Sequence, residues 1–401
     1  MTSEWPLVRI GDVCDLCLGK MLDQKKNKGK YRKYLGNSNV RWGCFDLSEL
    51  SEMKFEEDED ERYGIKRGDL IICEGGEPGR CAIWDEQAPD MMIQKALHRV
   101  RPKDSSCDIR YLFYWLTMAG RLGSLDPFFT GTTIKHLTGR ALADVSFPLP
   151  PVFIQREIAS TLSTLDARIA VNKKINHHLV QMAQIIFKSW FVDFEPWDGE
   201  IPEGWTYTTL DALCSLIAKG ITPQYDESSA EIVINQKCIR NKAIDLSLAR
   251  RHRPKRINEK WLKYGDILIN STGEGTLGRV AQFFIGDCNF TVDSHITIVR
   301  PIEDELVFFL GQWCLQRESE FAAMASGSTG QTDLPRERLK AMECIFPDAH
   351  TLLRFSQVLK PLVEMQVAAQ IESARLATLR DTLLPCLMSG ALSVADLDDA
   401  K

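Results

Sequence analysis

The stretch WPLVRIGDVC at Trp5–Cys14 returns near the middle of the chain as WTYTTLDALC at Trp205–Cys214. The segment GDLII at Gly68–Ile72 returns in the same way as GDILI at Gly265–Ile269. Further matches occur in the same order: Gly79-Arg80 with Gly278-Arg279, Val100–Pro102 with Val299–Pro301, and Gly131–Thr133 with Gly327–Thr329. The offset between the copies stays between 196 and 200 residues, far above the period of a solenoid. The repeat therefore predicts two whole domains, each with its own core.

The composition is that of an ordinary soluble protein, with 44% hydrophobic and 26% charged residues in a chain of 401, long enough for two to three domains. The N-terminal residues Met1–Trp5 lack the features of a signal peptide, and no apolar stretch reaches the roughly 18 residues of a membrane helix. We therefore expect a cytoplasmic protein with no membrane contact. The one Cys-x-x-Cys motif, Cys14 to Cys17, has no second pair or nearby histidine, so no metal site is expected.

A duplicated chain presents two similar surfaces, which suits a partner that itself repeats, such as duplex DNA. The formal charge of -6 means that any contact with DNA must come from local basic patches. Two basic runs are present, Lys25–Lys33 in the first copy and Arg250–Arg256 in the second. The acidic run Glu56–Glu61 offsets the first in net charge. Each run by itself is equally compatible with a solvated loop.

Local patterns in the first copy, residues 1–150, predict mixed strand and helix. Apolar segments rich in strand-forming residues lie at Asp69–Cys73, Arg80–Trp84 and Leu97–Val100, and a helical pattern comes next at Ile109–Leu122. Prolines at 148, 150 and 151 then close the domain.

A single long helix is predicted next, because Val152–Phe194 contains no glycine or proline. Residues spaced four and three apart form a coiled-coil seam: Ile158, Leu162, Leu165, Ile169, Asn172, Asn176, Leu179, Ala183, Ile186 and Trp190. At ~1.5 Å per residue such a helix is ~60 Å long, more than one domain needs. The two asparagines either fix the register of a partner helix or mark a water-exposed section.

A second seam lies after the second copy: Phe355, Val358, Leu362, Met365, Ala369, Glu372, Leu376, Leu379 and Leu383. Pro361 lies within this region and is expected to kink the helix or to mark its true start. The predicted fold class is α/β (α+β), with two pseudo-symmetric domains joined by two long antiparallel coiled-coil helices. The boundaries are 1–150 and 196–350 for the domains, and 151–195 and 351–401 for the helices.

No catalytic motif is recognisable. The glycine-rich segments Glu74–Gly79 and Gly273–Gly278 lack the Gly-Lys-Ser/Thr of a phosphate-binding loop, and each fits a β-turn that places an arginine at the surface. Asp126–Phe129 resembles the Asp-Pro-Pro-Tyr signature of amino-methyltransferases but lacks its second proline, which favours a loop. We therefore expect a protein that recognises and assembles, without catalytic residues.

Three segments resemble one family, the specificity subunits of type I restriction-modification systems. They are SWFVDFEP at Ser189–Pro196 with PEGW at Pro202–Trp205, LRDTLLPCLMSG at Leu379–Gly390, and Pro150–Ala159. The resemblance covers essentially the whole chain in the family's order. The second copy departs from it at Leu353–Ser356, where the family has Gln-Arg-x-Ile, and at Cys386, where a basic residue is common.

The resemblance implies a DNA-reading subunit without an active site or a cofactor of its own. Each target-recognition domain, 1–150 and 196–350, would read one half of a bipartite, asymmetric DNA site. The helices, 151–195 and 351–401, would set the spacing and dock two modification subunits, which carry S-adenosylmethionine and methylate adenine. Up to two restriction subunits, motor–nucleases that use ATP and Mg, would join the complex. The alternatives are a self-contained adenine methyltransferase, which would bind S-adenosylmethionine alone, and a coiled-coil adaptor, which would ignore DNA.

Candidate DNA-binding side chains are basic, hydroxyl and amide groups in matching parts of the two copies. In the first copy they are Lys25, Lys26, Lys30, Arg32, Lys33, Arg41, Arg80, Thr130, Thr132, Thr133 and Lys135. In the second they are Arg240, Arg250, Arg251, Arg253, Lys255, Arg256, Arg279, Ser328, Thr329 and Gln331. Arg41 matches Arg240 and Arg80 matches Arg279, and each is predicted to contact a phosphate or a guanine edge. For the second pair the alternative is an ion pair with Glu77 or Glu274. Candidate docking and coiled-coil residues are Ile158, Leu162, Leu165, Ile169, Leu179, Ile186, Trp190, Leu362, Leu376, Leu379 and Leu383.

Overall fold

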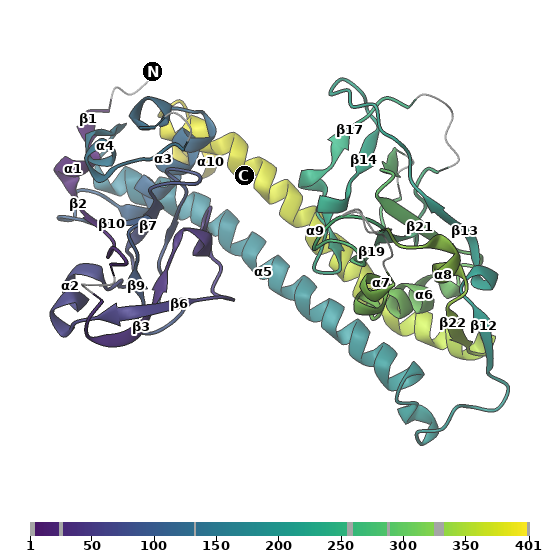
Figure 1. The fold of residues 1–401 in the computed structure, drawn as a ribbon. Coiled ribbons are helices and arrows are strands. Elements are labelled where there is room, and N and C mark those ends of the chain that lie inside the picture. The colour runs from purple at the N-terminus through teal and green to yellow at the C-terminus, as the bar shows by residue number, and fades with distance from the viewer. Residues whose placement is uncertain are drawn as a thin grey trace. The chain divides into compact units, whose positions relative to one another are not determined.

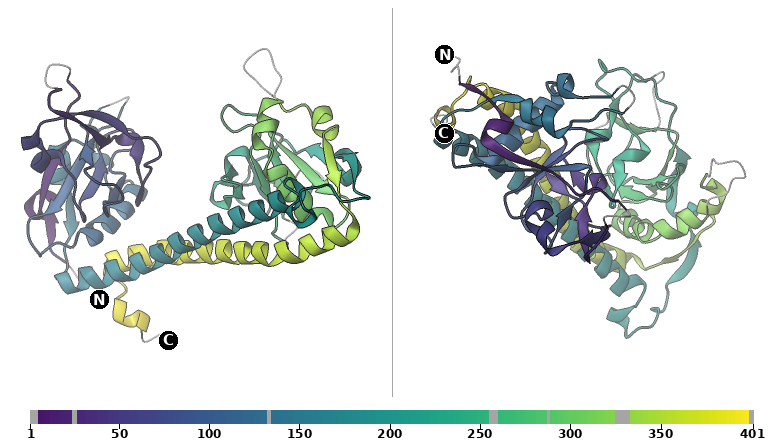
Figure 2. Two further views of the ribbon diagram at one scale, coloured as in Figure 1. Left: turned by 90° about the horizontal axis from the view of Figure 1, so that it is seen from below. Right: turned by 60° about the vertical axis from the view of Figure 1, so that its left-hand side comes forward.

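The chain forms two compact units in the computed structural model, which describes residues 5–23, 27–131, 134–254, 260–286, 289–324 and 333–398 (Figures 1 and 2). The first unit contains Met1–Ile169 and Ala374–Lys401, and the second contains Ala170–Ser373. The two long helices, α5 (Val152–Phe191) and α9 (Ala349–Met388), each contribute to both units. No helix among the described residues is long and apolar enough to cross a membrane.

The first unit is built on a four-stranded antiparallel sheet in the order β2-β10-β7-β8, with three smaller sheets, β6-β3-β9, β1-β11 and β4-β5. Its strands are β1 (Leu7–Arg9), β2 (Cys14–Leu18), β3 (Lys30–Leu35), β4 (Val40–Arg41), β5 (Cys44–Phe45), β6 (Ser51–Phe55), β7 (Leu70–Cys73), β8 (Cys81–Ile83), β9 (Met92–Ile93), β10 (Leu97–Pro102) and β11 (Ser146–Pro148). Its shorter helices are α1 (Ile10–Val13), α2 (Asp60–Tyr63), α3 (Ile109–Arg121), α4 (Gly139–Asp144) and α10 (Val394–Asp398). The strands and the helix predicted between residues 69 and 122 are confirmed to within two residues at each end.

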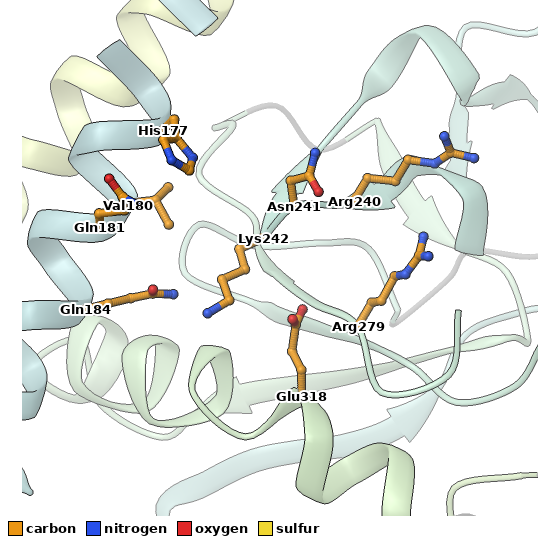
Figure 3. Close-up of a pocket in the computed structure, with 9 residues that line it drawn as sticks. All are labelled: His177, Val180, Gln181, Gln184, Arg240, Asn241, Lys242, Arg279 and Glu318. Carbon is orange, nitrogen blue, oxygen red and sulfur yellow. The ribbon is translucent and has the colours of Figure 1, made fainter. Parts of the chain in front are cut away.

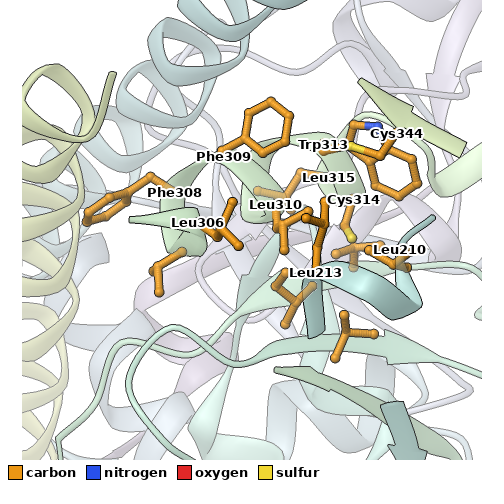
Figure 4. Close-up of a cluster of buried hydrophobic side chains, with 14 of the residues drawn as sticks. Leu210, Leu213, Leu306, Phe308, Phe309, Leu310, Trp313, Cys314, Leu315 and Cys344 are labelled. Atoms are coloured by element: carbon orange, nitrogen blue, oxygen red, sulfur yellow. The ribbon is translucent and has the colours of Figure 1, made fainter. Parts of the chain in front are cut away.

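The second unit repeats this topology, with sheets β13-β21-β18-β19, β17-β14-β20, β12-β22 and β15-β16. Its strands are β12 (Thr206–Thr209), β13 (Cys214–Lys219), β14 (Ile232–Ile234), β15 (Ile239–Arg240), β16 (Ala243–Ile244), β17 (Arg250–Arg251), β18 (Ile267–Asn270), β19 (Val280–Gln282), β20 (Phe290–Val292), β21 (Ile296–Pro301) and β22 (Glu343–Phe346). Its shorter helices are α6 (Leu306–Leu315), α7 (Glu318–Ala323) and α8 (Arg336–Lys340). All ten residues of α6 are buried, and several form the cluster in Figure 4. The predicted internal repeat is confirmed.

A buried ion pair explains why two short motifs return in both copies. Asp69 of the first GDLII segment accepts hydrogen bonds of 2.7 Å from Nε and Nη2 of Arg101, in the first Val-Arg-Pro motif. Asp266 and Arg300 form the same two bonds, both 2.7 Å, in the second unit. The aspartate side chains are only 2% and 0% exposed. Each pair therefore joins the start of one central strand to its neighbour in the sheet.

The two long helices run antiparallel in each unit. In the second unit Asn172 of α5 contacts Glu372 of α9, and Phe187 contacts Phe355. In the first unit Asp166 contacts Arg380, while Ile158 and Leu162 share a core with Leu384 and Leu387. Residue numbers rise along one helix as they fall along the other. The predicted pairing of the two helices is confirmed.

The seam on α5 is largely buried. Ile158, Leu162, Ile169, Leu179 and Ala183 are no more than 9% exposed, and Leu165, Ile186 and Trp190 are partly buried. Asn172 is 1% exposed and donates a hydrogen bond of 2.8 Å to Glu372 Oε2. Asn172 therefore lies buried against the partner helix and not in a water-exposed section.

The seam on α9 was predicted correctly only in part. Phe355 and Ala369 are buried as predicted, but Val358, Met365 and Leu379 are 42%, 55% and 46% exposed, so Leu379 is not a coiled-coil core residue. The prediction missed the buried residues Leu352, Leu359, Val363, Leu384 and Leu387. These residues pack against the domain cores as well as against α5, which shifts the buried face of the helix. Leu362, Leu376 and Leu383 are partly buried.

Pro361 does not mark the start of the second helix, because α9 begins at Ala349 and continues past it. A proline inside a helix removes one backbone hydrogen bond and costs about 3 kcal/mol. Phe355, Leu359 and Val363 flank it, and all three are at most 5% exposed in the core of the second unit. Burial of these side chains offsets the local loss.

Several cysteines are buried as small apolar side chains. Cys73, Cys81 and Cys344 are buried, and burial raises the pKa of Cys73 to about 11. The thiol therefore stays protonated at neutral pH. Within the described ranges, no group of three or more His, Cys, Asp or Glu side chains is placed to hold a metal ion.

Breaking the buried ion pair should strongly destabilise the second unit. We predict that Asp266→Ala lowers the free energy of unfolding by about 3–5 kcal/mol, because it leaves Arg300 without its carboxylate. Urea denaturation of the full chain measures this change. Glu364→Ala, which removes an exposed carboxylate 4.0 Å from Lys360, is the control and should cost at most about 1 kcal/mol. Equal losses for the two variants would contradict the prediction.

Candidate nucleic-acid interface

The second unit contains a hollow of about 870 Å³ between α5, the β15–β16 hairpin and the turn after β18 (Figure 3). Its lining residues are His177, Val180, Gln181, Gln184, Arg240, Asn241, Lys242, Arg279 and Glu318. Arg240 and Arg279, two candidates from the repeat alignment, thus lie at one site together with Lys242. We call this site the basic groove. It is polar, and three of its nine residues carry a permanent positive charge.

The tip of the hairpin has an uncommon backbone. Asn241 and Lys242 both have positive φ, 50° and 61°, which is the geometry of a two-residue hairpin turn of type I′. Such turns favour Asn-Gly, because a side chain at positive φ costs roughly 1–2 kcal/mol. In the first copy the corresponding hairpin has Gly43, with φ 74°. A lysine thus replaces the glycine in the second copy.

The matching site of the first copy is closed by Glu77. This carboxylate accepts a hydrogen bond of 2.6 Å from Nε1 of Trp42 and lies 3.1 Å from Nη1 of Arg80. Arg80 also donates to the carbonyl of Asn37 at 2.8 Å, and its side chain is only 14% exposed. Arg80 is therefore not at the surface, and the alternative of a structural ion pair is correct for it.

Arg279 has a different environment, because the residue three positions before it is Thr276 and not a glutamate. Its Nη2 donates to the carbonyl of Gly275 at 2.8 Å. Among the described residues Arg279 forms no ion pair, so the alternative pairing with Glu274 is wrong. Arg279 is one of the residues that line the basic groove, and in Figure 3 its side chain extends away from α5.

Four other cations of the first copy also have acidic neighbours. Lys30 lies 3.0 Å from Glu57, Arg41 3.6 Å from Asp46 and Lys135 3.7 Å from Asp126. Arg32 pairs with Asp60. Two of these acids, Glu57 and Asp60, belong to the run Glu56–Glu61. The acidic run therefore pairs directly with Lys30 and Arg32 of the basic run, in addition to lowering the net charge of the chain. Lys33 on β3 is exposed, and Thr130 pairs through its backbone with His136.

The basic run of the second copy holds the loop that precedes it in the sequence. The Arg250 guanidinium lies 3.6 Å from the centre of the Tyr225 ring, and Arg253 Nε lies 3.1 Å from Asp226. Arg251 donates to the carbonyl of Ser229 at 2.6 Å. The three arginines are exposed, so these contacts leave them accessible.

Nine predicted DNA contacts lie outside the described residues: Lys25, Lys26, Thr132, Thr133, Lys255, Arg256, Ser328, Thr329 and Gln331. The sequence prediction missed Lys242 and Gln184. A signal for Lys242 exists in the repeat, because the alignment that pairs Arg41 with Arg240 also places Lys242 opposite Gly43. No sequence pattern indicates Gln184.

The comparisons with known proteins agree with this architecture. The family model "Type I restriction modification DNA specificity domain" matches residues 2–181. The chain is 29% identical over 360 residues to the type I restriction enzyme MjaIX specificity subunit of Methanocaldococcus jannaschii, covering 82% of this chain and 79% of that one. It is 24% identical over 285 residues to the EcoBI specificity subunit of Escherichia coli, covering 63% and 57%. The crystal structure of the S subunit of a type I system from M. genitalium has the same fold, with a TM-score of 0.56, 17% identity and 96% coverage of both chains.

The duplicated domains and the paired helices form the same fold as the M. genitalium S subunit, and the family model that matches the first domain describes a DNA specificity domain. The chain is thus similar, over most of its length, to the specificity subunits of type I restriction-modification systems.

Proposed function

We propose that each domain reads one half of a bipartite, asymmetric DNA site. The observation that carries this proposal is that two sheets of identical topology hold unlike surfaces. The cations around Arg80 are paired with carboxylates, whereas Arg240, Lys242 and Arg279 line an open groove. Shared scaffolds with different side chains are what a reader of two different half-sites needs. In this proposal residues 1–150 and 196–350 are the recognition domains.

The two helices, 151–195 and 351–401, would position the partner subunits. Two modification subunits would methylate adenine with S-adenosylmethionine, and up to two restriction subunits would cleave DNA with ATP and Mg. These cofactors belong to the partners in the proposal, and none is assigned to this chain. The complex would work in the cytoplasm, where its DNA lies.

An exposed apolar stripe on α5 offers a docking surface for the modification subunit. Val171, Ile175, Met182 and Ile185 are 46%, 36%, 48% and 66% exposed. Their spacings of four, seven and three residues place them on one face of the helix, beside the seam that packs on α9. An apolar stripe with this period fits a second helix, and we propose that a helix of the modification subunit covers it.

The stripe can be tested by giving it charge. We predict that Met182→Glu with Ile185→Glu prevents the modification subunit from co-purifying, because docking would bury two carboxylates. Lys173→Glu, an exposed change on another face of the same helix, should leave co-purification intact. Co-purification of the double variant at the wild-type level would contradict the proposed surface.

The bipartite reading can be tested by exchanging one domain. Residues 1–150 are replaced by the first domain of another family member, and adenine methylation is sequenced in a host that carries the modification subunit. We predict a change in one half of the methylated motif alone, because the second domain keeps its own core. A motif that changes in both halves would contradict the proposal.

A further inference from the structure

The basic groove has an excess of hydrogen-bond donors that the protein leaves without acidic partners. Within the described ranges, the side chains of Arg240 and Lys242 form no ion pair. The one carboxylate that lines the groove, Glu318, accepts the backbone N–H of Val280 at 2.7 Å and is thus committed to the strand. The groove therefore carries a net positive charge, which favours an anionic ligand.

The central helix adds a further donor to the same groove. The side-chain nitrogen of Gln184 on α5 is buried and has no hydrogen-bond partner, and the residue lines the groove together with Lys242. In Figure 3 the Lys242 side chain extends toward α5, which carries Gln184. A buried amide N–H without a partner costs about 1–3 kcal/mol, so an acceptor that fills this position would relieve an existing penalty.

Two pairs of residues distinguish the groove from its closed counterpart in the first copy. Thr276 of the second copy occupies the position of Glu77, which pairs with Arg80 in the first copy. Lys242 occupies the position of Gly43 in the hairpin of the first copy. The Trp42 ring beside that hairpin packs on Gly120, where a Cβ would lie 2.7 Å from the ring. The first copy thus fills its site with an indole and an ion pair, while the second leaves it open.

Lys242 occupies its position at a conformational cost. A glycine would adopt its φ of 61° without strain, as Gly43 does in the first copy. Residues held in such conformations occur preferentially at functional sites. The strain therefore agrees with a binding role for the lysine side chain.

We propose that the basic groove binds the phosphate backbone of DNA beside the second half-site, with Arg240, Lys242 and Arg279 as the charged contacts. Roughly half to two-thirds of protein–DNA hydrogen bonds go to phosphate and sugar oxygens, and arginine and lysine are among their usual donors. The first domain has no equivalent contact through Arg80. This inference rests on the proposed function, and it replaces the expectation that the two domains share matching phosphate contacts.

The decisive variant is Lys242→Gly, studied in the full chain with its modification subunit. The probe is duplex DNA that carries the motif identified by methylation sequencing. The plot of log affinity against log salt should become shallower by about 0.9 for each phosphate that the variant no longer neutralises. The methylated motif should stay the same, because no base contact is removed. Thermal unfolding should occur at the wild-type temperature or above, because the substitution relieves the strained φ.

A second variant closes the groove without removing a cation. Thr276→Glu introduces the acid that holds Arg80 in the first copy, so Arg279 should pair with it and the salt dependence should again become shallower. Arg336→Gln on α8 removes one positive charge outside the groove and is the control, with an unchanged slope. Wild-type slopes for both Lys242→Gly and Thr276→Glu would overturn the inference. In that case the proposed function stands as long as the wild type still binds its motif in a salt-dependent way, and it fails if the wild type does not.

Discussion

The structure depends on two long helices that supply part of the core of both units. Phe187 of α5 and Phe355 of α9 lie in the core of the second unit, while Leu162 of α5 and Leu387 of α9 lie in that of the first. Residues that are 168 positions apart in the second unit and 225 positions apart in the first therefore meet in one core. As a consequence, the first unit includes the C-terminal residues from Ala374 onward. Neither unit is stabilised by its own sheet alone, because both helices supply side chains to its core.

Polar contacts within the helix pair add specificity to this packing. Asn172 bonds to Glu372 in the second unit, and Arg380 bonds to Asp166 in the first. Apolar side chains tolerate sliding of one helix past another, whereas a buried amide or guanidinium loses its partner when the register shifts. These pairs therefore favour a single alignment of α5 and α9 within each unit.

The repeat predicted that the two units share one fold, because motifs such as Gly-Asp and Val-Arg-Pro belong to a buried ion pair that each sheet needs. The seam of α5 was also predictable from its spacing. The seam of α9 was predictable only in part, since several of its buried residues face the domain core and Leu379 is exposed. At the candidate site the sequence indicated Arg240 and Arg279 but placed Arg80 wrongly. Whether each arginine forms an ion pair depends on the residue three positions before it and on the fold around it. Glu77 pairs with Arg80, whereas Thr276 has no charge to pair with Arg279.

We propose that the paired helices set the gap between two independently read half-sites. Inserting four residues between Asn172 and Asn176 lengthens α5 by ~6 Å and rotates the remainder of the helix by ~40°. Because B-DNA rises ~3.4 Å per base pair, the unspecified spacer should grow by about one or two base pairs. Sequencing of adenine methylation in a host that carries this variant and the modification subunit measures the spacer directly. We predict a longer spacer between unchanged half-sites. A variant that folds and methylates with the original spacer would show that the helices do not set the gap.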